Sequence, residues 1–300
     1  MKISALKAPW NLRAISHRSL PKFPSLDIFR NFKYYYQSWT NGKTYYAYVI
    51  DSGVRVSHKE FEGCTENLWT AFKTPDGKDD FEDQNGHGTL VAGIIASKTY
   101  GVAKSAKVIS LRALDAKNQG RKSISIKTME QAIADIAKHE RHNNAVINMS
   151  LGGECSRAQN EVINRAFLRR SPSFKNGAGI LFVTASGNEN VDASTYSPAS
   201  AHEAITVGTI DKRWKSIFSL LGRTGTSMAA PHVAAVALNA MAVSSKMSTQ
   251  VRHFLTETGT KDKITGDLRK SPNVLVNNNN GKQESCARKD PRNEKEDDEC

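Results

Sequence analysis

The sequence is poor in the features that mark membrane, secretory-leader and disulfide-rich proteins. No run approaches the roughly eighteen apolar residues of a membrane span. Lys7, Pro9 and Asn11 interrupt the stretch where a secretory signal would be apolar, so no signal peptide is visible. No propeptide is visible either. The four cysteines show no CxxC pair and no metal-ligand spacing, and they decide neither pairing nor redox compartment. We therefore expect no membrane partner.

The composition that remains is that of an ordinary globular protein. The 300 residues are 39% hydrophobic and 24% charged, and they are enough to bury the core of one large domain. The net charge of +12 would attract nucleic acid or an acidic surface, but it serves equally as a solubility device. Because no nucleic-acid-binding motif accompanies the charge, we expect no nucleic-acid partner.

The carboxyl-terminal segment differs in composition from the rest of the chain. Residues 281–300 hold five basic and seven acidic residues and no large apolar side chain. Such a segment cannot bury enough surface to offset the entropy lost on ordering. We expect a single domain over residues 1–280, followed by a charged, disordered tail over residues 281–300.

Strand-like runs alternate with helix-like segments between these two ends. Runs rich in β-branched and aromatic residues predict strands, whereas apolar residues at three- and four-residue steps predict helices. The predicted strands are 44–50, 108–114, 145–150, 180–185 and 204–208, and the predicted helices are 87–97, 125–139, 158–168 and a long one from 227. This alternation predicts an α/β fold of three layers, a doubly wound, mainly parallel sheet with helices on both faces.

Four polar residues stand at the ends of predicted elements, where the core does not require them. Asp51 ends a strand, His87 lies between two glycines at a helix start, and Ser227 opens another helix. A serine hydroxyl is a weak nucleophile unless an imidazole takes its proton, and the imidazole needs a carboxylate to orient it. Asn188 follows a strand, and its amide could stabilise an oxyanion together with the backbone N–H of Ser227. The set predicts catalysis by Asp51, His87 and Ser227, with Asn188 in the oxyanion hole.

Two other motifs are weaker signals. His139 and His142 are three residues apart on a predicted helix and could share a metal ion, but they lack the HExxH spacing of zinc peptidases. The sequence NGKT at 41–44 resembles the end of a phosphate-binding loop, but the upstream glycine of that loop is missing. We therefore assign neither a metal site nor a nucleotide site.

Five motifs occur in a fixed order along the chain. They are VIDSGV at 49–54, NGHGTLVAGIIAS at 85–97, SLGG at 150–153, ASGN at 185–188 and GTSMAAPHVA at 225–234. In this order they resemble the subtilisin-like serine peptidases, in particular their fungal proteinase K-like branch. The similarity runs from about residue 7 to about residue 280, and it includes the long stretch TYSPASAHEAITVGTIDKRW from Thr195.

The resemblance implies a serine endopeptidase that works through an acyl-enzyme and water and needs no cofactor for its chemistry. Members of this family hold the substrate as an extended strand, and Ala185 and Gly187 match the lining of the primary specificity pocket. The resemblance also implies polypeptide substrates, a monomer and an extracellular location. The positions that match the segments flanking the substrate are Asn118, Gln119, Gly120, Ser150, Leu151 and Gly152.

The chain departs from the family pattern just before Ser227. Ser227 follows Asn188 by only 39 positions, so a segment near 219–225 is missing relative to the family. The alternative to an active peptidase is therefore an inactive or misfolded remnant of one. The family's structural calcium is affected as well, because the carbonyls of His202 and Ala204 match two of its ligands, but its acidic ligand falls in the missing stretch. No metal is assigned.

Overall fold

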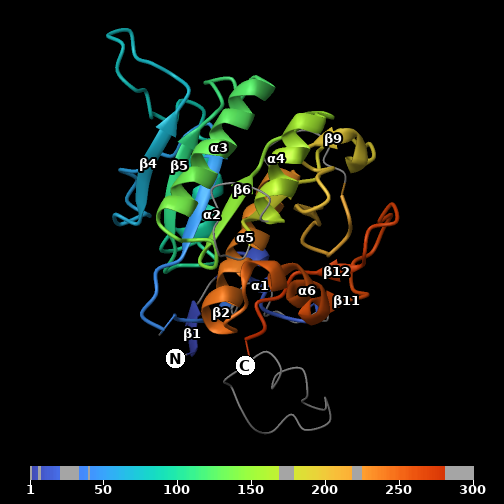
Figure 1. The fold of residues 1–300 in the computed structure, drawn as a ribbon. Helices are drawn as coiled ribbons and strands as arrows, with labels where there is room; N and C mark the ends of the chain where they lie inside the picture. The colour runs from blue at the N-terminus through green and yellow to red at the C-terminus, as the bar shows by residue number, and fades with distance from the viewer. Residues whose placement is uncertain are drawn as a thin grey trace, which may run out of the picture.

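A parallel sheet forms the centre of the protein (Figure 1). The computed structural model describes residues 2–5, 8–20, 34–39, 41–168, 179–217 and 225–280. All neighbouring strands of this sheet run parallel, which confirms the predicted mainly parallel α/β fold. In spatial order the strands are β10 (Ile205–Val207), β8 (Leu181–Ala185), β6 (Ala145–Met149), β3 (Tyr46–Asp51), β5 (Lys107–Arg112) and β4 (Thr65–Thr70).

Helices cover both faces of this sheet, as predicted. Because side chains alternate along a strand, Ala47 and Val49 of β3 join one buried cluster, whereas Tyr48 and Ile50 join the other. Figure 1 shows the sheet between these two helical layers. The first cluster includes helices α2 (His87–Ala96) and α5 (Thr226–Val243), and the second includes α3 (Lys122–Lys138) and α4 (Arg157–Phe167).

Smaller elements surround the central sheet. Three antiparallel strand pairs, β1 with β2, β7 with β9 and β11 with β12, accompany two further helices and a short 3₁₀ helix. Their bounds are β1 (Lys2–Ala5), α1 (Trp10–Ala14), β2 (Tyr34–Gln37), β7 (Gly153–Glu154), η2 (Ala193–Thr195), β9 (Tyr196–Ser197), α6 (Ser248–Thr258), β11 (Thr260–Lys261) and β12 (Val274–Leu275).

The structure corrects the predicted elements in two places. Edge strand β4 was not predicted, because four of the six residues in its sequence TENLWT are polar and the sequence carries no alternating pattern. Helix α3 ends at Lys138, so the prediction that His139 and His142 lie on one helix is wrong. The predicted tail, and all of the segment near 219–225 except residue 225, lie outside the described residues.

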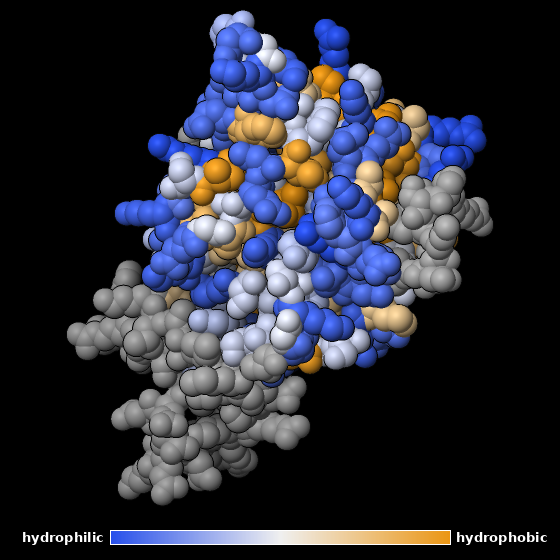
Figure 2. All heavy atoms as spheres, turned by 60° about the vertical axis from the view of Figure 1, so that its left-hand side comes forward, coloured by the Kyte–Doolittle hydropathy of each residue, from blue (hydrophilic) through white to orange (hydrophobic). Residues whose placement is uncertain are grey.

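One described helix, α5, is long and apolar enough to cross a membrane by length and composition alone. Within the protein, 67% of that span is buried, and its residues form much of the first core cluster. This is the pattern of a core helix. Figure 2 shows one face of the molecule, on which hydrophilic residues surround smaller hydrophobic areas.

Candidate active site

The residues predicted to be catalytic gather beyond the carboxyl ends of the parallel strands. Asp51 is the last residue of β3, and Asn188 comes three residues after the end of β8. His87 and Ser227 lie in the first turns of α2 and α5, the two helices on one face of the sheet. Open parallel sheets form their binding sites at this edge, because strands end and helices begin there.

His87 and Asp51 form a direct pair. His87 Nδ1 lies 2.7 Å from Asp51 Oδ1, and the Asp51 side chain is almost fully buried. The backbone N–H of Ser52 donates to the same carboxylate oxygen at 2.7 Å. Because a carboxylate only accepts hydrogen bonds, Nδ1 carries the proton and Nε2 of a neutral ring keeps its lone pair. His87 is therefore oriented as a base.

Gly88 permits the close approach between the loop after β3 and the start of α2. A Cβ atom on this residue would lie 2.1 Å from the carbonyl oxygen of Gly53 and 3.0 Å from Asp51 Cβ. No side chain can occupy that space, so a glycine after His87 is a geometric requirement of the pair.

A second carboxylate, Asp83, ties the same two segments together. Its Oδ1 accepts hydrogen bonds from Ser52 Oγ at 2.8 Å and from the N–H of Gly86 at 2.8 Å. Its Oδ2 accepts from the N–H of Thr89 at 2.9 Å and from the hydroxyl of Thr89 at 2.5 Å. Ser52 Oγ in turn accepts from the N–H of Gly88 at 3.0 Å. Sequence reasoning missed Asp83, although it stands only four residues before His87.

The charges of these carboxylates set the protonation of His87. Burial lowers the pKa of His87, but the hydrogen bond to Asp51 and the negative charges of Asp51 and Asp83 outweigh it, and the pKa is raised above 6.5. Burial also raises the pKa of Asp83, but hydrogen bonds from Thr89, Gly86 and Ser52 outweigh it, and the pKa lies below its usual value. Asp83 is therefore ionised when it acts on His87.

Asn188 is fixed against the start of α5. The N–H of Thr226 donates to Asn188 Oδ1 at 2.9 Å, and the Thr226 hydroxyl donates to it at 3.1 Å. The amide oxygen is thereby engaged, and the donor Nδ2 is left to bind another group. Gly225 allows the contact, because a Cβ there would lie 2.4 Å from Asn188 Oδ1.

A cavity of about 50 Å³ lies beside Ser227 and gathers half of the residues predicted to bind substrate. Its wall also includes Glu189, which directly follows Asn188 in the sequence and which sequence reasoning missed. The residues that line the cavity are Leu151, Gly152, Ala185, Gly187, Asn188, Glu189, Tyr196, Ala199, Thr226 and Ser227.

The other residues predicted to bind substrate lie outside this cavity. Asn118, Gln119 and Gly120 follow β5, in a turn where the N–H of Gln119 donates to Asp115 Oδ1 at 2.9 Å. This turn neighbours the segment before His87, since Asn85 Nδ2 donates to the carbonyl of Ala116 at 2.9 Å. Ser150, directly after β6, points its hydroxyl toward α5 instead.

The two halves of the site are not closed by a hydrogen bond. Among the hydrogen bonds of the described residues, none joins Ser227 Oγ to His87 Nε2. In enzymes without substrate, such catalytic bonds are commonly long and tighten only in the complex. The His87–Asp51 pair and the start of α5 held by Asn188 thus meet at one edge of the sheet.

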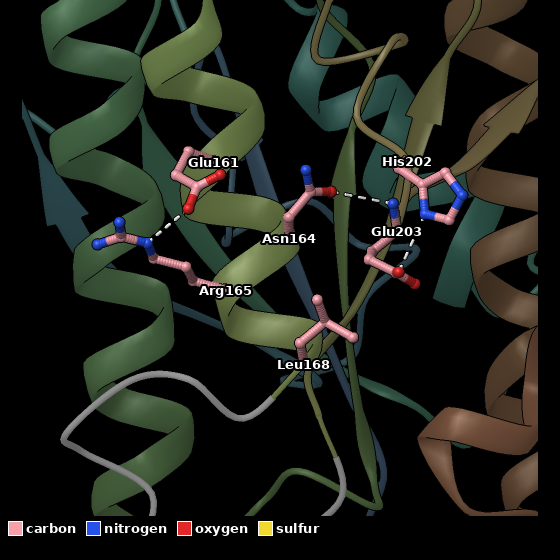
Figure 3. Close-up of a pocket in the computed structure, with 6 residues that line it drawn as sticks. All are labelled: Glu161, Asn164, Arg165, Leu168, His202 and Glu203. Carbon is pink, nitrogen blue, oxygen red and sulfur yellow. Dashed lines mark hydrogen bonds and ion pairs between the residues drawn. The ribbon is translucent and has the colours of Figure 1, made fainter.

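A larger cavity, of about 170 Å³, lies elsewhere and includes no residue that was predicted to be catalytic or to bind substrate. Figure 3 shows it between α4 and the segment that precedes β10. In its walls, Glu161 accepts a hydrogen bond from Arg165, and the side-chain oxygen of Asn164 accepts one from the N–H of Glu203. It is not part of the active site.

The calcium ion that the family resemblance implies does not fit the residues present. The carbonyl oxygens of His202 and Ala204 both accept hydrogen bonds from the Arg252 guanidinium, at 3.1 and 3.2 Å. A cation therefore already holds these oxygens, whereas calcium needs six to eight oxygen ligands. Among the described residues, no group of three or more His, Cys, Asp or Glu could hold a metal ion.

Comparison with known proteins shows which family the chain belongs to. The model of the family described as "Subtilase family" matches residues 42–223, a range that contains Asp51, His87 and Asn188 and ends before Ser227. A crystal structure of a cold adapted subtilisin-like serine proteinase is 30% identical, with a TM-score of 0.73. That match covers 90% of this chain and 98% of the solved one.

Fungal proteases are among the similar curated proteins. Alkaline protease 1 of Aspergillus flavus is 35% identical over 300 residues, covering 91% of this chain and 68% of the relative. Subtilisin-like proteinase Mp1 of Magnaporthiopsis poae is 37% identical over 303 residues, covering 90% of this chain and 70% of the relative. These matches confirm the resemblance that the sequence motifs carry.

Proposed function

Because this chain belongs to the subtilase family of serine proteases, we propose that it is an endopeptidase that forms an acyl-enzyme on Ser227. The observation that carries the proposal is the 2.7 Å pair between His87 Nδ1 and Asp51 Oδ1, at the sheet edge where Ser227 lies in the first turn of α5. Polypeptides are the substrate class of this family, and the chemistry needs no cofactor. We propose further that the protein works as a monomer outside the cell, with no nucleic-acid or membrane partner.

The proposed reaction begins with proton transfer from Ser227 to His87. Nε2 of His87 takes the hydroxyl proton while Oγ attacks the scissile carbonyl, and Asp51 stabilises the imidazolium that forms. Asn188 Nδ2 and the backbone N–H of Ser227 donate to the developing oxyanion. His87 then protonates the leaving amine, and a water molecule repeats the sequence to release the acyl group.

The substrate would bind as an added strand at the same edge. Residues 118–120 follow β5 and residues 150–152 follow β6, the two parallel strands on either side of β3, and their backbone groups can pair with an extended peptide. One substrate side chain would enter the cavity that Ala185, Gly187 and Glu189 help to line.

A serine-directed fluorophosphonate tests this function. We expect a mass increase on Ser227 alone, located by peptide mapping, and its loss in His87→Ala. Absence of labelling in soluble, folded protein would favour the competing function, an inactive remnant whose short Asn188–Ser227 stretch prevents assembly of the site. In that case the protein would be at most a peptide-binding module and not an enzyme.

A further inference from the structure

Helix α5, whose first turn contains Ser227, has a proline at the position that would normally donate a hydrogen bond to Ser227. Pro231 lies inside α5, four residues after Ser227. A helical residue normally donates its N–H to the carbonyl four residues before it, but proline has no N–H. The backbone carbonyl of Ser227, the proposed nucleophile, therefore lacks its regular helical donor.

Ser150 donates to that carbonyl from outside the helix. Its Oγ lies 2.7 Å from the carbonyl oxygen of Ser227, and the Ser150 residue is 2% exposed. Asn148, fully buried in β6, donates its Nδ2 to Ser150 Oγ at 3.0 Å. Because Asn148 occupies a lone pair of this hydroxyl, the hydroxyl proton points to Ser227. The chain of contacts begins on a central strand, which β3 and β8 hold on either side.

We propose that Ser150 is a positioning residue for the nucleophile, whose hydroxyl supplies the hydrogen bond that Pro231 cannot give. The proposal rests on the proposed function of Ser227. The family resemblance places the backbone of Ser150 in a substrate-binding segment, and the proposal adds a role for its side chain. The Ser150 hydroxyl fixes the first turn of α5 against β6, and with it the Oγ and N–H of Ser227.

The consequence is a specific kinetic signature. Loss of the Ser150 hydroxyl leaves the Ser227 carbonyl without this donor, so the first turn of α5 can shift relative to His87 and Asn188. A misplacement of about 1 Å in a catalytic group costs on the order of 10²-fold in rate. Turnover should fall, whereas KM should change little, because the cavity walls stay in place.

The experiment compares the wild type with Ser150→Ala, Pro231→Ala and the double variant. For each protein, one measures the rate of fluorophosphonate labelling at Ser227, kcat and KM for a peptide, and the equilibrium constant of unfolding. We expect Ser150→Ala to label about 10- to 100-fold more slowly. The double variant should regain most of that loss, because Pro231→Ala restores a backbone N–H that can donate to the Ser227 carbonyl.

Ser248→Ala is the matched control. Ser248 is also fully buried, and its hydroxyl donates to a backbone carbonyl, that of Gly179, at the start of α6. Its loss should lower stability without changing the labelling rate, and no gain should follow from adding Pro231→Ala.

Two results would overturn the proposal. One is an unchanged labelling rate in Ser150→Ala, and the other is a slowed rate that the double variant does not recover. If the wild type itself is not labelled, the proposed function fails, but the unfolding equilibrium constants still test the proposed role of Ser150. A coupling of about tenfold or more between the effects of Ser150→Ala and Pro231→Ala on the unfolding constant then supports that role, whereas additive effects refute it.

Discussion

The two halves of the active site are held in place by different kinds of contact. On the His87 side a charged carboxylate, Asp83, gathers hydrogen bonds from Ser52, Gly86 and Thr89. On the nucleophile side two uncharged groups hold the start of α5, namely the amide of Asn188 and the hydroxyl of Ser150.

This difference separates electrostatic control from geometric control. Changes around Asp83 alter the charge near His87, and so they should move the pH dependence of the reaction. Changes around Asn188 and Ser150 alter the placement of donors and backbone without changing net charge. They should lower the rate and leave the pH dependence where it is.

The largest effect should come from removing the base. His87→Ala should lower kcat for a peptide about 10⁶-fold, a size known from subtilisin, a member of this family, and not one that the present geometry yields. The exposed His253→Ala is the control and should retain full activity. Comparable losses in both variants, or a fully active His87→Ala, would contradict the assignment.

Asn188→Ala should have the next largest effect. Loss of the amide donor should reduce turnover about 10²–10³-fold, again a size taken from subtilisin, while the pH profile keeps its position. Steady-state kinetics between about pH 5 and 9 measure both quantities. A displaced pH profile would show that Asn188 acts through His87, against the comparison drawn above.

Gly225→Ala tests the contact between Asn188 and α5. The new Cβ would lie 2.4 Å from Asn188 Oδ1, so the amide or the helix start must move. We expect a loss of about 1–3 kcal/mol in the free energy of unfolding, together with lower turnover. Gly153→Ala, where a Cβ meets nothing within 4 Å, should change neither in denaturant unfolding or peptide assays.

Asp83→Asn should move the pH dependence toward lower pH. His87 must be neutral to act as a base, and the charge of Asp83 raises its pKa, so activity is lost as pH falls through that raised value. The interaction between Asp83 and protonated His87 affects stability in the opposite direction to activity. It stabilises the fold below pH 6.5, and this stabilisation is lost as the pH rises through the pKa of His87 in the folded protein. Glu82→Gln removes an exposed neighbouring charge and is the control.

An NMR titration of His87 checks this prediction without relying on hydrolysis. The pKa of His87 should be lower in Asp83→Asn than in the wild type and in Glu82→Gln. Equal pKa values of His87 in Asp83→Asn and the wild type would show that Asp83 does not raise the pKa of His87.

The smallest effect concerns stability rather than activity. Arg252→Gln should lower the free energy of unfolding by about 1 kcal/mol, because the carbonyls of His202 and Ala204 lose a charged donor that is partly exposed. A chelator should leave the Tm of the wild type unchanged. A fall in Tm on chelation would mean that calcium stabilises the chain after all.

The sequence predicted the parallel strands and the helices around them because these are buried apolar runs with sharp ends. β6 (AVINM) and β8 (LFVTA) are buried at every position. β4 was not predicted because it lies at the sheet edge, where only one of its six residues is buried.

The reactive residues were predictable because their chemistry requires fixed residue types, whereas their supports depend on contacts between distant segments. Ser150 and Ser227 are 77 positions apart, and Asp83 reaches Ser52 across 31. Only the proline four residues after Ser227 was a local signal for the missing donor. It becomes informative once the helix is known to begin at Thr226.

The most direct test of the two modes of control is the pH dependence of fluorophosphonate labelling at Ser227 in the wild type, Asp83→Asn and Ser150→Ala. We predict one ionisation above pH 6.5 in the wild type, a lower value in Asp83→Asn, and an unshifted but slower profile in Ser150→Ala. A shifted profile in Ser150→Ala, or an unshifted one in Asp83→Asn, would contradict the separation of electrostatic from geometric control.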